Sequence, residues 1–123
     1  RPADHEALCG RARAWFRMGH FTKAISDCDE SLIAEPSASA FSIRGDAWLA
    51  MKNYDQAIAD FEAAHRFDDT VAEAYRQRAE VRRADGQNAL ADADLQQAGK
   101  ITSALNGESG ADKPKVTQVP FPE

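Results

Sequence analysis

Long apolar runs and a surplus of positive charge are both missing from this sequence of 123 residues. No apolar run approaches the roughly 18–20 residues that a membrane-spanning helix needs, and no signal-peptide pattern opens the chain. Lys and Arg number 15 against 20 Asp and Glu, which gives a net charge of −5. Because phosphate contacts need clustered Lys and Arg, this balance argues against nucleic-acid binding. We therefore expect neither a membrane nor a nucleic acid as partner.

Cysteine and histidine are also scarce, with two and three copies. Cys9 and Cys28 form no C-x-x-C pair, and no histidine stands near them at metal-ligand spacing. The sequence leaves a disulfide between them as an alternative, but the pattern favours two small buried side chains. Free thiols would favour a reducing, cytoplasmic compartment. His5, His20 and His65 have no matched partner and are interpreted as solvated. We therefore predict no metal, no cofactor and no enzymatic activity.

A pattern of small and aromatic residues repeats at intervals of 33 and 34 residues. Its clearest copy, residues 38–71, contains Arg-x-x-Ala-Trp-x-x-Met followed by Tyr-x-x-Ala-Ile-x-Asp. Both motifs occur 33 residues earlier, with Phe in place of Tyr, and a weaker copy lies 34 residues later. Such a period, with two apolar bursts per copy, is typical of an array of paired helices.

The apolar periodicity within the copies predicts six helices. They cover residues 4–18, about Thr22 to Pro36, 38–51, 54–67, about 71–84 and about 88–105. We predict that Gly19, Gly86 and Asn53 adopt left-handed conformations in the turns between paired helices. We also predict that Thr70-x-x-Glu73 forms a capping box at the start of the fifth helix.

The copies divide the chain into three repeats, at about 5–37, 38–71 and 72–105, within one domain of residues 1–105. Glycines and prolines follow from Gly107 onward, so 106–123 is predicted to be a linker with an extended tail at 116–122. Because the sequence begins at Arg1 rather than Met, we expect it to be part of a longer protein.

The repeats resemble the tetratricopeptide repeat, a 34-residue helix-turn-helix unit. The second repeat matches best, through Phe41, Gly45, Trp48, Tyr54, Ala57, Phe61 and Ala64. The first repeat departs from the pattern at Cys28 and Ser31, and the third has polar replacements at Arg82 and Asn88. The resemblance implies an all-α, right-handed solenoid of three repeats. Within it, small residues such as Gly45 and Ala57 are expected to face each other, so that paired helices approach closely.

In that family the first helix of each repeat lines a concave groove, so the resemblance implies a non-enzymatic module that binds a peptide or helix of a partner protein. Phe16 and Leu49 would be apolar anchors, and the arginines favour acidic segments slightly. The matching family positions for a terminal-carboxylate clamp include Glu73, which would repel a carboxylate, so we predict no such clamp. The predicted groove residues are Cys9, Arg13, Phe16, Arg17, Ser42, Asp46, Leu49, Arg76, Glu80 and Arg83.

Two other features leave alternatives open. Asp27, Asp60 and Asp94 recur at one repeat position, and we interpret them as a structural or solvating row on the second helices. Neighbouring helices pack roughly 10 Å apart, too far for shared acid–base chemistry. The alternative function is structural: the chain self-associates through its end helices, or the tail at 116–122 docks in its own or a neighbour's groove.

Overall fold

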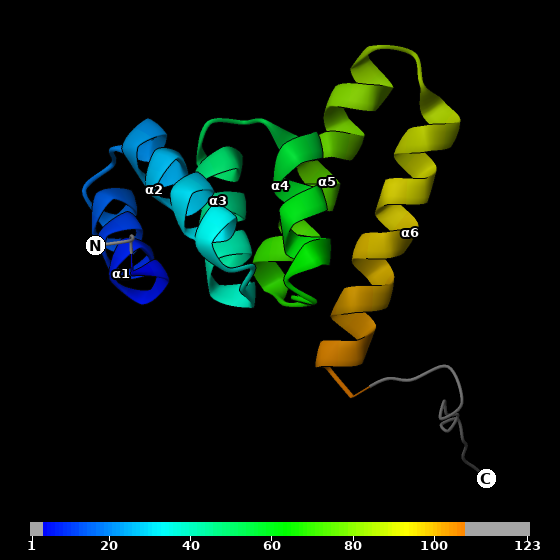
Figure 1. The fold of residues 1–123 in the computed structure, drawn as a ribbon. Helices are drawn as coiled ribbons and strands as arrows, with labels where there is room; N and C mark the ends of the chain where they lie inside the picture. Colours follow the sequence, from blue (N-terminus) through cyan, green and yellow to red (C-terminus); the bar gives the residue numbers. More distant parts are fainter. Residues whose placement is uncertain (1–3, 108–123) are drawn as a thin grey trace, which may run out of the picture. The chain divides into compact units, whose positions relative to one another are not determined.

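The computed structural model describes residues 4–107, which form six α-helices and contain no strand (Figure 1). The all-α prediction is confirmed for these residues, whereas the predicted tail at 116–122 lies outside them. The chain divides between Phe67 and Asp68 into two compact units, called here the N-terminal and C-terminal units. The helices are α1 (His5–Arg17), α2 (Phe21–Ala34), α3 (Ala38–Ala50), α4 (Tyr54–Ala63), α5 (Asp69–Ala84) and α6 (Asn88–Leu105).

The turns inside the three helix pairs share one backbone device. Gly19, Lys52 and Gly86 each have a positive φ, of 83°, 65° and 81°. In the second turn the left-handed residue is therefore Lys52 and not Asn53, which has a φ of −93° and precedes α4. In each of these turns the left-handed residue is the first one after the helix C-cap. The position in the turn therefore determines which residue is left-handed, and the intrinsic preference of the residue type does not.

The boundary between α4 and α5 differs most from the prediction. α4 ends at Ala63, and His65 has a φ of 55°, which no helix continues. Phe67, predicted on the apolar face of this helix, is instead 61% exposed. α5 then begins at Asp69 because the side chain of Asp68 accepts a hydrogen bond of 3.1 Å from the amide of Val71. The predicted capping box two residues later is therefore wrong.

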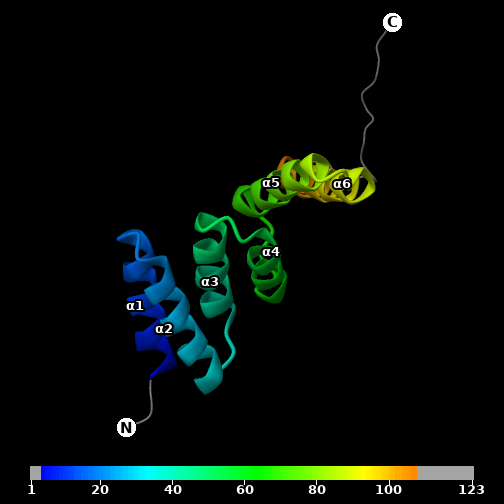
Figure 2. The same cartoon turned by 90° about the horizontal axis from the view of Figure 1, so that it is seen from above.

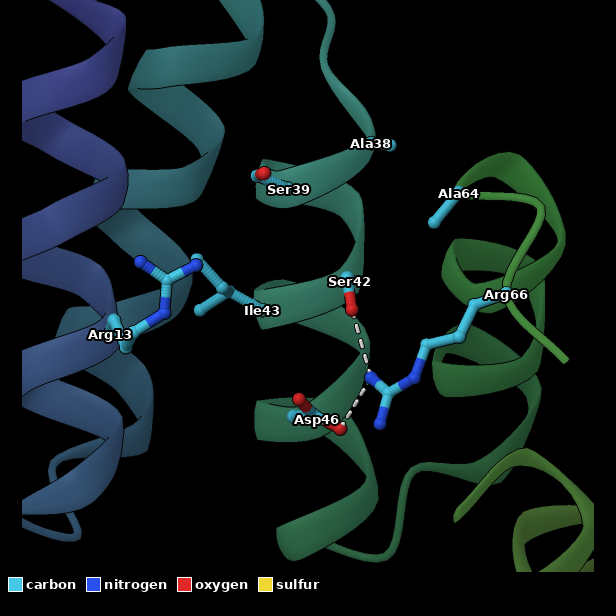
Figure 3. A pocket seen from close by; sticks show the side chains of 8 residues that line it. All are labelled: Arg13, Ala38, Ser39, Ser42, Ile43, Asp46, Ala64 and Arg66. Carbon is cyan, nitrogen blue, oxygen red and sulfur yellow. Dashed lines mark hydrogen bonds and ion pairs between the residues drawn. The ribbon is translucent and has the colours of Figure 1, made fainter. Parts of the chain in front are cut away.

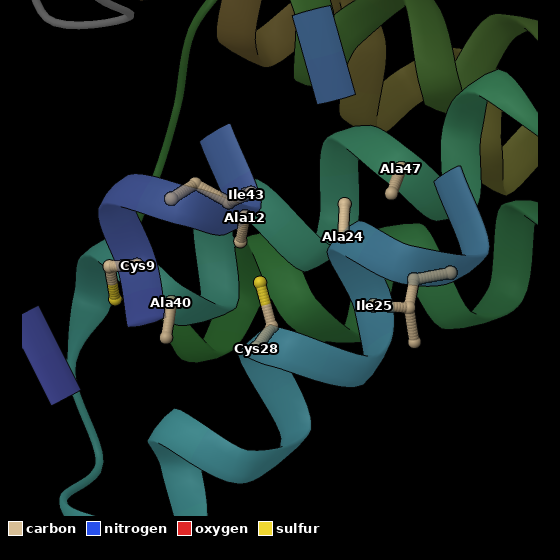
Figure 4. Packing of buried hydrophobic residues seen from close by; sticks show 8 residues of the cluster. All are labelled: Cys9, Ala12, Ala24, Ile25, Cys28, Ala40, Ile43 and Ala47. Atoms are coloured by element: carbon tan, nitrogen blue, oxygen red, sulfur yellow. The ribbon is translucent and has the colours of Figure 1, made fainter. Parts of the chain in front are cut away.

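One core cluster of the N-terminal unit lies where α1, α2 and α3 meet (Figure 4). Trp15, Phe16, Phe21, Leu32 and Trp48 are only partly buried and pack around it. The core consists mostly of small side chains, which let the helix backbones approach closely. Its buried members are Cys9, Ala12, Ala24, Ile25, Cys28, Ala40, Ile43 and Ala47.

α3 and α4 approach each other closely at Gly45. A Cβ atom on Gly45 would lie 2.6 and 2.7 Å from two ring atoms of Phe61, and 3.2 Å from the carbonyl oxygen of Ala57. The predicted close approach of Gly45 to Ala57 is confirmed, and Phe61, with none of its surface exposed, fills the adjoining space.

The C-terminal unit is the pair α5 and α6, which lie side by side and contact each other (Figure 2). Tyr75 and Ala79 of α5 are buried, as are Ala91, Ala98 and Ile101 of α6. The predicted limits of the last helix, 88–105, agree with α6.

Candidate partner-binding site

The N-terminal unit has a surface hollow of about 430 Å³ beside α3 (Figure 3), called here the α3 hollow. Three of the predicted groove residues, Arg13, Ser42 and Asp46, lie on its wall. Arg13 comes from α1, and Ser42 and Asp46 come from α3. The complete lining is Arg13, Ala38, Ser39, Ser42, Ile43, Asp46, Ala64 and Arg66.

The polar side of the α3 hollow is one face of a helix. Ser39, Ser42 and Asp46 follow one another at spacings of three and four residues, which places them along one side of α3. Ser37 fixes the start of this helix, because its side chain accepts a hydrogen bond of 3.2 Å from the amide of Ala40. Two hydroxyls and a carboxylate are therefore presented to the hollow from a rigid element.

Arg66 is a lining residue that the sequence analysis did not identify. The left-handed turn at His65 ends the preceding helix, and the guanidinium of Arg66 lies 4.7 Å from the ring centre of Phe61. Its Nη1 donates hydrogen bonds of 2.9 Å to the hydroxyl of Ser42 and to the carboxylate of Asp46. No periodic signal could have found Arg66, because it lies outside every helix.

The ionic balance of the α3 hollow is one positive charge, from two arginines against one aspartate. Asp46 is neutralised by its ion pair with Arg66, and both side chains are largely buried. The side chain of Arg13 is exposed and makes no hydrogen bond or ion pair with any residue between 4 and 107. The hollow therefore contains a guanidinium group that forms no ion pair with the described part of the chain.

A second hollow of about 270 Å³ adjoins the first, because Arg13 and Ser39 line both. We call it the α1 hollow. The predicted groove residue Cys9 lies here, but it is 7% exposed and its sulfur is 3.4 Å from the hydroxyl of Ser31. The side chain therefore belongs mainly to the core. The lining consists of His5, Glu6, Cys9, Arg13, Ser37 and Ser39.

Three other predicted groove residues of this unit, Phe16, Arg17 and Leu49, line neither of these two hollows. Phe16 packs on Phe21, with ring centres 5.6 Å apart, and both rings pack against the core. Leu49 is half-buried, and Arg17 is exposed. The structure therefore separates Arg13, which lies in the hollows, from Arg17, one turn further along α1.

The C-terminal unit has its own hollow, of about 390 Å³, which gathers the predicted residues Arg76, Glu80 and Arg83. Arg76 lies 3.0 Å from the carboxylate of Glu73, and Arg83 lies 2.8 Å from that of Asp92. Exposed ion pairs of this kind contribute about 0–1 kcal/mol, so both arginines remain able to contact a ligand. Ala79, Ala84 and Leu95 complete the lining and make it largely apolar.

The recurring aspartates are ion-paired with arginines 16 residues earlier. Both oxygens of each carboxylate accept from one guanidinium, in the pairs Arg11–Asp27, Arg44–Asp60 and Arg78–Asp94, over 2.7–3.0 Å. The aspartates are 5%, 5% and 3% exposed, so the solvating interpretation is wrong and the structural one is confirmed. Each pair joins the first helix of a repeat to the second. The constant Arg-to-Asp spacing was the signal that would have revealed the pairing.

The described residues contain few side chains that are arranged for catalysis or metal binding. Within 4–107 no group of three or more His, Cys, Asp and Glu side chains could hold a metal ion. Cys9 and Cys28 are buried free thiols, and desolvation by burial raises the pKa of Cys28 to about 12. At neutral pH this thiol is protonated and a poor nucleophile. Among the same residues, no helix combines the length and apolar character needed to cross a membrane.

Comparison with known proteins gives a limited similarity. No protein-family model matches this chain. The chain is similar to Protein SGT1 homolog of Oryza sativa subsp. japonica, with 30% identity over 67 residues. The match covers 54% of this chain but only 18% of the length of that relative, so it concerns one segment of a much longer protein. The six helices of residues 4–107 are compatible with a helical repeat.

Proposed function

We propose that the chain is a non-enzymatic protein-interaction module of three tetratricopeptide-like repeats, which binds a peptide or helix of a partner along the first helices of the repeats. The observation that carries this proposal is the gathering of groove residues in open hollows. Arg13, Ser42 and Asp46 line one, and Arg76, Glu80 and Arg83 line the other.

The distribution of charged groups supports binding rather than catalysis. The buried aspartates are each held by an arginine with both carboxylate oxygens, which leaves them no role as acid or base. Arg13, Arg76 and Arg83 instead lie on open surfaces, where they can contact a partner. A cytoplasmic setting accords with the two free thiols.

Selection from a random peptide library tests the proposal. Random peptides of about 12 residues, long enough to cross the hollows in extended form, are displayed on phage and selected on the immobilised chain. Ser39→Trp places a large ring where the α3 and α1 hollows join, and Ser26→Trp places the same ring on the exposed surface of α2.

The proposal predicts enriched peptides that bind the wild-type chain and Ser26→Trp but lose binding to Ser39→Trp. Both substituted positions are exposed, so circular dichroism should show unchanged helix content in both variants. Failure of any peptide to enrich would contradict the proposal. Equal binding to all three proteins would contradict binding at the α3 and α1 hollows and leave only the hollow of the C-terminal unit.

Self-association is the second candidate, and exposed apolar side chains of the C-terminal unit favour it. Val81, Leu90, Leu95 and Leu105 are 42–48% exposed on α5 and α6, the two helices described in this unit. Apolar surface of this kind often marks an interface. Light scattering across a concentration series distinguishes the candidates, because self-association predicts a mass that rises with concentration and Leu90→Glu should abolish that rise. A constant monomer mass would contradict this second candidate.

A further inference from the structure

We infer that the α3 hollow binds the side-chain carboxylate of an Asp or Glu within an extended partner peptide, and that Arg13 is the cation that receives it. This inference deepens the proposed function and rests on it. It assigns one partner chemistry to one hollow and separates Arg13 from the other arginines of the first helices.

Charge complementarity is the first argument. Arg13 is exposed, lines the hollow and has no partner among residues 4–107. A guanidinium binds a carboxylate through two parallel hydrogen bonds, which gives direction as well as attraction. The remaining charges of the lining, Arg66 and Asp46, neutralise each other. A carboxylate entering the hollow therefore meets a net positive charge.

Arg66 keeps that cation available. Asp46 lines the same hollow as Arg13, and without a partner it would compete with a ligand for the guanidinium. Figure 3 shows Arg13 and Arg66 approaching α3 from opposite sides, with the bonds of Arg66 reaching Asp46 and Ser42. Arg66 is thus a positioning residue, because it acts on the ligand by holding Asp46 away from Arg13.

Hydroxyl donors complete the site. The oxygen of Ser42 accepts a hydrogen bond from Arg66, so its own O–H group can donate to a ligand. Ser39 is exposed on the same face of α3 and offers a second O–H donor. A carboxylate has about four acceptor positions, which match one guanidinium and two hydroxyls.

The adjacency of the two hollows indicates the source of the carboxylate. Arg13 and Ser39 belong to both linings, so a chain can continue past the cation instead of ending there. We therefore assign the carboxylate to a side chain and not to a chain terminus. In the α1 hollow Glu6 would repel a second acidic residue, so the site favours an isolated Asp or Glu over an acidic run.

The test uses the full chain and a fluorescein-labelled peptide from the phage selection, acetylated and amidated at its ends, with binding followed by fluorescence anisotropy. The wild-type chain should enrich peptides with a single Asp or Glu at a fixed place. Replacing that residue by Asn or Gln should weaken binding about fivefold, which is the upper end of the effect of one exposed ion pair.

Arg13→Gln should bind the acidic peptide and its amide counterpart equally, because the discriminating cation is gone. Arg17→Gln is the matched control, since it removes an exposed arginine of the same helix that lines neither hollow, and it should keep the fivefold preference. Arg66→Met should reduce the preference for the acidic peptide, because it releases Asp46.

Several results would overturn the inference. Discrimination that persists in Arg13→Gln, or is lost in Arg17→Gln, would place the anion elsewhere. The counterpart peptide, with Asn or Gln in place of the acidic residue, can also be made with a free C-terminal carboxylate. If this change restored its affinity, the chain terminus would be the ligand. Enriched peptides without an acidic preference would contradict the carboxylate site but leave the proposed function standing, whereas no enrichment would contradict both.

Discussion

Glycine at position 45 is the residue on which the approach of α3 to α4 depends. A Cβ atom there would stand 2.6 Å from the ring of Phe61, whereas one on Gly10 of α1 would have no atom within 4 Å. We expect Gly45→Ala to destabilise the fold by about 1–3 kcal/mol through overpacking. Gly10→Ala should stabilise it by about 0.5–1 kcal/mol, since alanine favours a helix. Urea unfolding measures both, and equal stabilisation by the two would contradict the assigned packing.

Burial of the Cys28 thiol makes stability depend on alkaline pH. Its pKa rises to about 12 in the folded chain, against about 8.5 in an unfolded one. The folded state thus keeps a proton that the unfolded state loses, so this contribution is complete below about pH 8.5 and is lost progressively up to about 12. We expect the free energy of unfolding to fall over that range, and less steeply in Cys28→Ala. Equal slopes in the two proteins would refute the burial argument.

Single residues were predictable where one backbone rule decides them. Gly19 and Gly86 were identified because each follows a helix at the position that needs a left-handed conformation. Lys52 was missed, because preference favoured its neighbour Asn53 while the turn geometry selected Lys52. Arg66 was missed for a different reason, since its role comes from a tertiary contact with Asp46 that no local pattern encodes.

The arginine–aspartate pairs connect whole helices. Arg44 of α3 binds Asp60 of α4 and also reaches Asp29 of α2, so it joins three helices. Its hydrogen bonds, first of all with Asp60, raise the pKa of the Arg44 guanidinium. Among the described residues, the side chain of Arg11 of α1 binds only Asp27, through two hydrogen bonds, and is far more exposed, at 60% against 24% for Arg44.

We therefore expect Asp60→Asn to cost more stability than Asp27→Asn. Removing one partner of a fully buried pair costs about 3–5 kcal/mol, and the partial exposure of Arg44 reduces the expected loss to about 2 kcal/mol. The loss in Asp27→Asn should be smaller, because water can solvate Arg11 once it is released. Chemical unfolding of both variants checks the order, and a larger loss in Asp27→Asn would contradict it.

All six described helices were predictable from their apolar faces, and their ends were predictable where glycine or proline marks them. The last helix was placed at 88–105, as α6 is. The end of α4 was placed four residues too late, because Phe67 continues the apolar period although the chain has already turned at His65. The side chain of Asp68 belongs to the next helix, a role its position after an apolar run did not reveal.

For the molecule as a whole, the repeat pattern located the candidate surface but not the state of each side chain on it. Arg13, Ser42 and Asp46 meet in one hollow, and the family resemblance had placed all three on one predicted groove. Phe16 lies on the same helix as Arg13, yet it packs on Phe21. Periodicity predicts the face of the helix on which a side chain lies. Packing decides whether that side chain is exposed to a partner or buried against the chain's own core.

The central claim is that a partner peptide lies along the α3 and α1 hollows, and NMR titration of the full chain tests it most directly. The selected acidic peptide should shift the backbone amide signals of Arg13, Ser39 and Ser42, and leave Ser26 of α2 and Gln56 of α4 unchanged. Shifts concentrated at Ser26 and Gln56, with Arg13 and Ser39 unaffected at saturating peptide, would contradict the account.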